Sequence, residues 1–258
     1  MRLSRALANV AHASPALVWS MITRPRFLLS LPGRPPSSST EDAAIALFPD
    51  ASRQFVDQLR LEFLNHEDLW LDLNRAMVAQ RRRHVNPAPW NEFLYVLVRI
   101  ARPAVFVETG VFDGQSSAII LQAMEDNGSG ELYSIDLPAT RPIEGSTHRM
   151  RESSLPPGQQ PGWLVPERLR PRYHLRLGDA RQLVPQLLDE LPEIGAFFHD
   201  SLHTYDHMRF EYEAAWPHLV DGGLLISDDI HWNHAFDEFA RKVGRSYVRV
   251  QTFGAMRR

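Results

Sequence analysis

The 258-residue sequence contains no cysteine, so it can form no disulfide bond, no thiolate metal site and no cysteine nucleophile. Any bound metal must therefore be held by carboxylates, imidazoles or carbonyl oxygens. These ligands favour hard or borderline ions such as Mg²⁺, Mn²⁺, Ca²⁺ or Zn²⁺. Long apolar runs are absent too, because no stretch of about 18 apolar residues is available to span a membrane.

The chain also lacks an excess of positive charge. Its formal net charge is −3, which gives no reason to expect a nucleic acid as a partner. An apolar content of 44% with 23% charged residues is that of an ordinary soluble globular protein. A chain of this length buries a full core as one α/β domain, and it needs no second domain.

The N-terminal segment lacks the uninterrupted apolar stretch of a secretion signal. Its start is positively charged, but Asn9, His12 and Ser14 interrupt any hydrophobic region, and arginines follow close behind. We therefore expect a cytoplasmic protein and interpret residues 1–50 as a basic, flexible leader and linker. Two interpretations of the leader stay open: a frayed terminus, or an arm that contacts a membrane surface peripherally or forms a homo-oligomer.

Apolar residues recur at helical spacing between residues 51 and 83, which predicts one or two amphipathic helices. Residues 89–103 predict a further helix, because proline suits its first turn and a second proline ends it. We expect residues 51–103 to form N-terminal helices that pack on the core. The basic run Arg81–His84 is interpreted as a solvated helix end, where cations are favourable.

From residue 104 onwards, short apolar runs alternate with amphipathic segments. The expected strands are residues 104–110, 131–137, 172–178, 194–200, 222–229 and 246–253, and the expected helices are 115–126, 180–190, 204–219 and 233–243. This alternation predicts an α/β fold with a doubly wound, mostly parallel sheet of six or seven strands. In such sheets, ligands bind outside the carboxyl ends of the strands. Residues 104–258 are therefore expected to form the catalytic domain.

One connection breaks the alternation. Residues 138–171, between the second and third expected strands, are rich in proline and glycine where a crossover helix would be expected. Long irregular connections in compact domains are often lids or binding loops. We expect this insertion to form a lid over the site, with Arg141, Arg149, Arg151 and Trp163 available to recognise an acceptor.

The first expected strand ends in a glycine-containing turn that leads into a helix, from Glu108 through Gly110, Phe112 and Gly114 to Ser116. Such a turn lets a ligand approach the backbone, with helix N–H groups pointing at it. The glycine spacing is not that of dinucleotide-binding motifs, and no Gly-Lys-Ser/Thr follows. The turn therefore argues against both a Rossmann dehydrogenase and a P-loop protein.

Acidic residues follow the next two expected strands. Asp136 ends the second strand, a position where a carboxylate commonly accepts hydrogen bonds from ribose hydroxyls. Asp179 and Ala180 follow the third strand. A cap of the next segment is the alternative interpretation of Asp136, and for Asp179 alone a cap of the following helix is favoured. Three polar strand ends at one edge of the sheet favour a nucleoside pocket.

The stretch FHDSLHTYDH follows the fourth expected strand and places Asp200 at its end, with His203 three residues further on. Asp228 and Asp229 end the fifth strand. Neighbouring strands lie about 5 Å apart, so these three carboxylates are expected to converge if the two strands pair. Their mutual repulsion would be relieved by a divalent cation, although carboxylates that merely cap two helices are the alternative.

His203 is then placed to act as a general base, because an imidazole titrates near neutral pH. The other nearby histidines are interpreted as surface residues, with His231 as the strongest candidate for an exception; they are His207, His218, His231 and His234.

Together, residues 104–243 resemble the class I S-adenosylmethionine (SAM)-dependent methyltransferases. They are most similar to the metal-dependent group that includes macrolide-sugar O-methyltransferases and cephalosporin-hydroxylase-like proteins. The segment VETGVFDGQSS resembles the first SAM-binding motif, YSIDLP the ribose-binding acidic motif, and LGDA the segment near adenine. The most specific part is FFHDSLHTYDHMRFEYEAAWPHLVDGGLLISDDI. The resemblance covers a little over half of the chain.

This resemblance implies a SAM-dependent O-methyltransferase that acts on a hydroxyl of a sugar or another small natural product. It implies SAM contacts from Glu108, Gly110, Phe112, Gly114, Ser116, Asp136, Asp179, Ala180 and Asp200. It further implies Mg²⁺ or another hard divalent ion on Asp200, Asp228 and Asp229, with His203 as the base. The family often has Glu at the position of Asp228, and it closes the sheet with a hairpin where only one strand, residues 246–253, is expected here.

Two other functions stay open at this point. The first is a metal-dependent hydroxylase or hydrolase on the same fold, since a fold does not determine a reaction. The second is a non-catalytic module that binds SAM.

Overall fold

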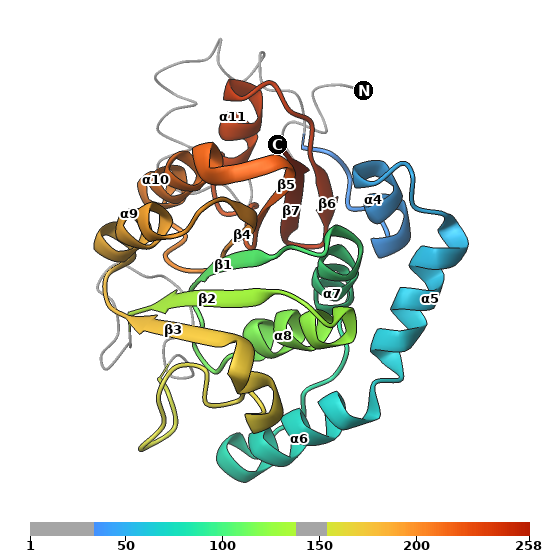
Figure 1. The fold of residues 1–258 in the computed structure, drawn as a ribbon, viewed down its shortest axis with the longest axis vertical. Helices are drawn as coiled ribbons and strands as arrows, with labels where there is room; N and C mark the ends of the chain where they lie inside the picture. Colours follow the sequence, from blue (N-terminus) through green and yellow to red (C-terminus); the bar gives the residue numbers. More distant parts are fainter. Residues whose placement is uncertain (1–33, 138–153) are drawn as a thin grey trace, which may run out of the picture.

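The computed structural model describes residues 34–137 and 154–258, and its centre is a seven-stranded sheet with the order β3-β2-β1-β4-β5-β7-β6 (Figure 1). The strands are β1 (Val105–Thr109), β2 (Glu131–Asp136), β3 (Tyr173–Leu177), β4 (Ile194–His199), β5 (Leu219–Ser227), β6 (Val248–Val250) and β7 (Phe253–Arg257). Strands β1 to β5 pair in parallel, whereas β7 is antiparallel to both β5 and β6. The predicted doubly wound, mostly parallel sheet is confirmed, with seven strands.

Helices cover both faces of this sheet (Figure 1). They are α4 (Thr40–Leu47), α5 (Arg53–Leu64), α6 (Glu67–Arg81), α7 (Pro89–Ala101), α8 (Gln115–Asn127), α9 (Ala180–Glu190), α10 (Tyr205–Ala215) and α11 (Ala235–Lys242), with short 3₁₀ helices η2 (Glu167–Arg172) and η3 (Trp216–His218). No helix within the described ranges is long and apolar enough to cross a membrane.

The two faces follow from the alternation of side chains along each strand. Phe106 and Phe198 lie in a core with residues of α7 and α8. Val107 and Phe197, one position away on the same strands, lie in a second core with residues of α9, α10 and α11. Strands β1 and β4 lie inside the sheet, and apolar residues cover both of their faces. A ligand can therefore reach these two strands only at their ends.

The segment before α5 differs from its expected form. Residues 37–50 were expected to belong to the linker, but they include α4, which begins after the cap residue Ser39. The side chain of Ser39 accepts a hydrogen bond from Asp42 N, and Ala43 and Ala44 are buried. Ser38 donates its backbone N–H to Arg249 O at 2.7 Å, so this segment is attached to the C-terminal strands.

The C-terminal end also corrects a prediction. Residues 246–253 were expected to form one strand, but the chain reverses within them and forms the hairpin of β6 and β7. Gln251 adopts a φ of 53° at this reversal. Glutamine is uncommon in that conformation, and the turn therefore lacks the Gly or Asn signal that would have revealed it.

The connection between β2 and β3 contains no crossover helix in its described part, residues 154–172. Turns lead into η2, and Leu164, Val165 and Leu169 are buried in the core of the α7–α8 face. The rest of the expected lid, with Arg141, Arg149 and Arg151, lies outside the described residues, as does the leader up to residue 33.

Candidate active site

The carboxyl ends of the parallel strands carry the polar residues that the sequence motifs contain. Backbone hydrogen bonds continue the sheet into the turns beyond these ends. Asp200 N donates to Thr109 O at 2.8 Å, and Asp228 N donates to His199 O at 2.9 Å. Gly110 N donates to Ile135 O at 2.9 Å. The turns after β1, β4 and β5 are therefore adjacent, as predicted, along one edge of the sheet.

The turn after β1, here called the glycine turn (residues 110–114), is built on positions where only glycine fits. Gly110 has a φ of 80°, and a Cβ atom there would lie 2.1 Å from Asp200 O. Gly114 has a φ of 93°, and its Cβ would lie 2.7 Å from the Cα of Gly162. Both glycines allow backbone segments to approach more closely than any side chain permits.

Two predicted SAM contacts, Glu108 and Ser116, are bonded to each other beneath this turn. Glu108 is fully buried, and its carboxylate accepts hydrogen bonds from Ser116 Oγ at 2.6 Å, Ser117 Oγ at 2.5 Å and Ser134 Oγ at 2.8 Å. Burial raises the pKa of Glu108, and the three hydroxyl donors only partly oppose this. These side chains fix the start of α8 on β1 and β2.

Asp136 supports the glycine turn from β2. Its Oδ2 accepts hydrogen bonds from the backbone N–H of Val111 at 2.6 Å and of Phe112 at 2.8 Å. Phe112 has a φ of 51°, an unfavourable conformation for an aromatic residue, so these two bonds stabilise a strained turn. The other carboxylate oxygen of Asp136, Oδ1, takes no part in these two bonds.

Asp179 has the capping role that was the alternative interpretation of this carboxylate. It is the N-cap of α9, and its Oδ1 accepts a hydrogen bond from Arg181 N at 2.8 Å. Ala180, the first residue of that helix, is buried against the α9–α11 core. Both residues lie at the predicted edge, after β3.

Asp200, Asp228 and Asp229 influence one another electrostatically. Burial and then the negative charges of Asp228, Glu108 and Asp229 raise the pKa of Asp200 well above its usual value. Burial and the charge of Asp229 raise the pKa of Asp228 to about 6. The Oδ1 of Asp228 accepts hydrogen bonds from Thr252 Oγ1 and from Asp229 N, both at 2.6 Å. These two bonds and the nearby His231 only partly oppose the rise in the pKa of Asp228.

The chemistry of this cluster fits a hard divalent cation, because its side chains are carboxylates whose mutual repulsion a cation would relieve. Its geometry is not that of a preformed metal site. Among the described residues, no three His, Asp or Glu side chains are arranged so that they could hold a metal ion together.

His203 lies beside Asp200, with 3.7 Å between its Nε2 and Asp200 Oδ1. Its side chain is 13% exposed, and its ring centroid is 5.1 Å from that of His199. Burial, and secondarily the charge of His199, lower the pKa of His203 to about 3, so its imidazole is neutral at physiological pH. Its Nε2 has no hydrogen-bond partner within the described part of the chain. A neutral imidazole with an unbonded nitrogen can accept a proton.

A buried carboxylate beneath this edge was missed in the sequence. Glu211, on α10, is fully buried and accepts hydrogen bonds from Thr109 Oγ1 and His199 Nδ1, both at 2.6 Å. It also accepts from Ser201 Oγ at 2.8 Å and from His207 Nε2 at 2.9 Å. Burial alone would raise the pKa of Glu211, but the two histidines hold it below its usual value. Glu211 thus joins the ends of β1 and β4 to α10.

This network corrects the interpretation of His207 as a surface residue. His207 is 5% exposed, because it lies one helical turn before Glu211 on the buried face of α10. The (i, i+4) spacing of the two residues is a signal that was available in the sequence. His231 is 43% exposed in its side chain, and its Nδ1 lies 3.6 Å from Asp229 Oδ1.

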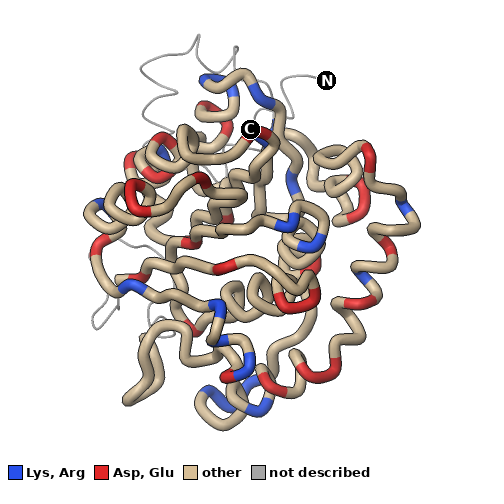
Figure 2. Tube along the Cα trace, viewed as in Figure 1, with Lys and Arg blue, Asp and Glu red and all other residues tan. Residues whose placement is uncertain are grey.

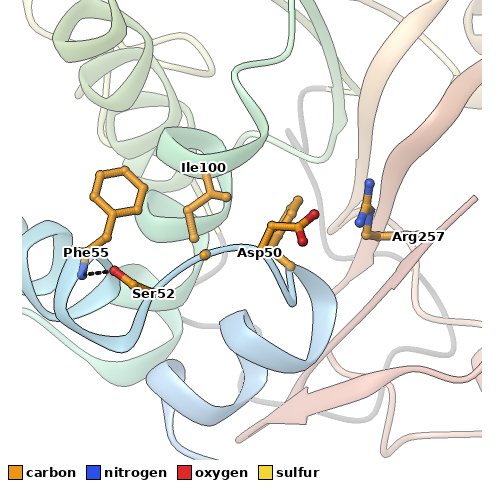
Figure 3. A pocket seen from close by; sticks show the side chains of 7 residues that line it. Asp50, Ser52, Phe55, Ile100 and Arg257 are labelled. Atoms are coloured by element: carbon orange, nitrogen blue, oxygen red, sulfur yellow. Dashed lines mark hydrogen bonds between the residues drawn. The ribbon is translucent and has the colours of Figure 1, made fainter.

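A hollow of about 480 Å³ lies elsewhere, between the α4–α5 connection, α7 and β7; it is lined by Phe48, Asp50, Ala51, Ser52, Phe55, Ile100 and Arg257 (Figure 3). Arg257 pairs with Leu224, three residues before the carboxyl end of β5. Its guanidinium already donates to Leu47 O and Gly222 O and lies over the ring of Phe48. This hollow is therefore separate from the candidate active site.

Residues 107–230 match a family model described as a methyltransferase domain. No curated protein matches the sequence significantly. Among solved structures, a Staphylococcus aureus protein provisionally identified as a caffeoyl-CoA O-methyltransferase is 12% identical, with 76% of this chain and 95% of that chain covered and a TM-score of 0.51. TomG, an O-methyltransferase of Streptomyces achromogenes involved in tomaymycin synthesis, is 18% identical, with coverages of 76% and 97% and a TM-score of 0.48.

An O-methyltransferase from Bacillus cereus is 16% identical, with coverages of 74% and 90% and a TM-score of 0.48. At such identities, similarity to solved structures shows the fold alone. Residues 107–230, a little under half of the chain, match the methyltransferase-domain family, and the seven-stranded sheet has the Rossmann-like fold of methyltransferases.

Proposed function

We propose that this protein transfers the methyl group of SAM to a hydroxyl oxygen of a small molecule, a sugar or another natural product, with Mg²⁺ or a similar hard cation bound. The observation that carries the proposal is His203. Its imidazole is neutral, its Nε2 is unbonded among the described residues, and it lies 3.7 Å from Asp200 at the edge where the glycine turn ends. A hydroxyl acceptor needs such a base, because it must lose a proton as it is methylated.

The binding of SAM is assigned to the glycine turn and the strand ends beside it. The close approach of Gly110 to Asp200 brings the turns after β1 and β4 together. Asp136 accepts hydrogen bonds from two backbone N–H groups of the glycine turn, and we assign to its Oδ1 the role of accepting from the ribose hydroxyls. Glu108 and Ser116 are assigned an indirect role, because they bond to each other under the turn.

The metal is assigned to Asp200, Asp228 and Asp229, whose mutual repulsion favours a cation. A bound divalent ion would supply Lewis acidity that lowers the pKa of the acceptor hydroxyl. For all three carboxylates to serve as ligands, their side chains must rotate from the positions described here, since those positions form no preformed site.

The methyl transfer is a single displacement at the methyl carbon. His203 accepts the hydroxyl proton at Nε2 while the acceptor oxygen forms a bond to the methyl carbon. The bond between that carbon and the sulfonium sulfur breaks, which leaves S-adenosylhomocysteine (SAH) and the methyl ether. Protonated His203 then returns the proton to solvent. Because the low pKa of His203 makes it a weak base, the residues must hold acceptor and methyl group in near-attack geometry.

Two measurements test the proposal. The first is calorimetric titration with SAH, in EDTA and then in Mg²⁺. One-to-one binding at micromolar Kd supports the nucleoside pocket, and no binding in either buffer contradicts the methyltransferase function. The second screens hydroxylated sugars and phenols for methyl transfer in both buffers. Equal turnover in EDTA and Mg²⁺ contradicts the metal, and turnover without SAM supports the hydroxylase or hydrolase alternative.

A further inference from the structure

Helix α6 lies outside the part of the chain that matches the methyltransferase family, yet its last residue contacts the glycine turn. Arg81 Nη2 donates a hydrogen bond to Asp113 Oδ1 at 2.6 Å and to Ser154 O at 3.0 Å. The Arg81 guanidinium also lies over the ring of Phe112, 5.0 Å from its centroid. The interpretation of the basic run as a solvated helix end is therefore wrong for Arg81, whose side chain is only 15% exposed.

Asp113 receives a second donor from the described part of the β2–β3 connection. The indole Nε1 of Trp163 donates to the same oxygen, Oδ1, at 2.7 Å. Asp113 is 4% exposed, so this carboxylate is enclosed between α6 and the segment around Trp163. Backbone bonds reinforce the enclosure, because Gly162 N donates to Phe112 O and Leu164 N donates to Asp113 O, both at 2.9 Å.

The glycine turn is thus held from two sides. On the sheet side, Asp136 accepts the N–H groups of Val111 and Phe112. On the outer side, Arg81 holds Asp113 and covers one face of the Phe112 ring. Phe112 keeps its left-handed backbone conformation only because its surroundings impose it. A turn that already has its bound shape before the ligand arrives loses little conformational entropy on binding.

We propose that Arg81 is a positioning residue of the cofactor site, and that α6 is therefore part of the SAM-binding machinery. Arg81 acts through Asp113 and Phe112, which it holds in the shape that receives SAM. This inference rests on the proposed function, because it takes the glycine turn as the place where SAM binds. It assigns a binding role to the N-terminal helices, which were expected only to pack on the core.

Other arginines lie near Arg81, but they do not make its hydrogen bond to Asp113. Arginines gather over the end of α6 and over η2, in the lower part of the view in Figure 2. Arg83 is 55% exposed in its side chain, and its Nη2 lies 3.8 Å from Asp113 Oδ2, beyond hydrogen-bond distance. Arg75, also on α6, is exposed and provides a matched control on the same helix.

The test measures SAH affinity by calorimetry for the full chain and for the variants Arg81→Gln, Asp113→Asn and Arg75→Gln, with thermal unfolding recorded for each. We expect Arg81→Gln and Asp113→Asn to raise the Kd for SAH at least tenfold, and Arg75→Gln to change it less than twofold. The double variant Arg81→Gln/Asp113→Asn should bind within threefold of the weaker single variant, because both changes remove the charge attraction of the same contact.

The possible outcomes separate the two proposals. If the unaltered protein binds no SAH, the proposed function fails and this inference fails with it. If it binds SAH and Arg81→Gln binds equally tightly, only this inference is overturned, even if the variant unfolds at a lower temperature. If Arg81→Gln does not fold, Arg81→Lys replaces it. Lysine keeps the charge but cannot stack its head group on Phe112, so a Kd between those of the parent and Asp113→Asn is expected.

Discussion

Glu211 offers a quantitative test of how the active-site edge is held together. The substitution Glu211→Gln keeps the size of the side chain but removes its charge and converts one of its two acceptor oxygens into an amide donor. In the protein, Glu211 accepts from Thr109 and His199 at Oε2, and from Ser201 and His207 at Oε1. The amide nitrogen that the substitution introduces would face two of these donors and could accept from neither.

The expected loss of stability follows from these contacts. A hydrogen bond to a charged group contributes about 1.5–3 kcal/mol, and Glu211→Gln removes two of them. We therefore expect the free energy of unfolding to fall by about 4 kcal/mol at pH 7. For a chain of this size, this corresponds to a decrease in Tm of roughly 10 °C.

Urea unfolding followed by circular dichroism measures this change, with Glu213→Gln as the control. Glu213 lies two residues further along α10, its side chain is 43% exposed, and it pairs with Arg209 and Lys242 at the surface. Its substitution should cost less than about 0.5 kcal/mol. Thr109→Val, which removes one donor to Glu211, should cost about 1 kcal/mol.

The contribution of Glu211 to the free energy of unfolding should depend on pH. The folded protein holds the pKa of Glu211 below its ordinary value of 4.5, so the folded state binds fewer protons there than the unfolded state. The stabilisation from Glu211 is therefore complete above pH 4.5 and is lost as the pH falls through the lower, folded-state pKa. The stability difference between the parent protein and Glu211→Gln should shrink below about pH 4.5. A loss under about 1 kcal/mol at pH 7, or a difference that grows in acid, would refute this reasoning.

Three further predictions concern the site itself. Gly110→Ala should abolish SAH binding in calorimetry and lower Tm, because a Cβ atom would lie 2.1 Å from Asp200 O; unchanged binding would exclude the close approach of the two turns. Asp228→Asn should stabilise the metal-free protein by about 2 kcal/mol at pH 8, as measured by urea unfolding. The raised pKa of about 6 means that folding disfavours the charged form of Asp228, and solvent reduces this effect because the residue is only half-buried. Lower stability of Asp228→Asn would contradict this sign. His203→Gln should leave SAH affinity within twofold and abolish methyl transfer to any acceptor identified; retained turnover would remove the base from the mechanism.

The sequence was sufficient to predict the architecture because its signals are local. Short apolar runs and the helices between them define β1 to β5, and the polar residues that follow each strand mark the edge where the site lies. The C-terminal hairpin was missed because Gln251 makes a reversal with a positive φ that glycine or asparagine normally provides. Helix α4 was missed because SSSTED reads as a linker, although Ser39 is a normal helix cap.

The contacts that shape the site could not be predicted in the same way, because they join distant parts of the chain. Nothing near Arg81 in the sequence indicates Asp113, and the two meet only because α6 packs against α8. Glu211 is one charged residue among several on α10, and its burial depends on where that helix crosses the end of β4. Periodicity gives the face of a helix, but it does not tell which strand end that face will meet.

The carboxylates of this edge divide into two kinds, and the division separates support from chemistry. Glu108 and Glu211 are fully buried and fully hydrogen-bonded, by hydroxyls in one case and by histidines and hydroxyls in the other. Such groups hold segments in place, because their hydrogen bonds join neighbouring elements. Asp200 and Asp228 instead have carboxylate neighbours, and burial together with these like charges raises their pKa values. Carboxylates that repel one another are stabilised when a ligand supplies positive charge between them. We therefore expect a cation, or the sulfonium of SAM, to bind beside Asp200 and Asp228.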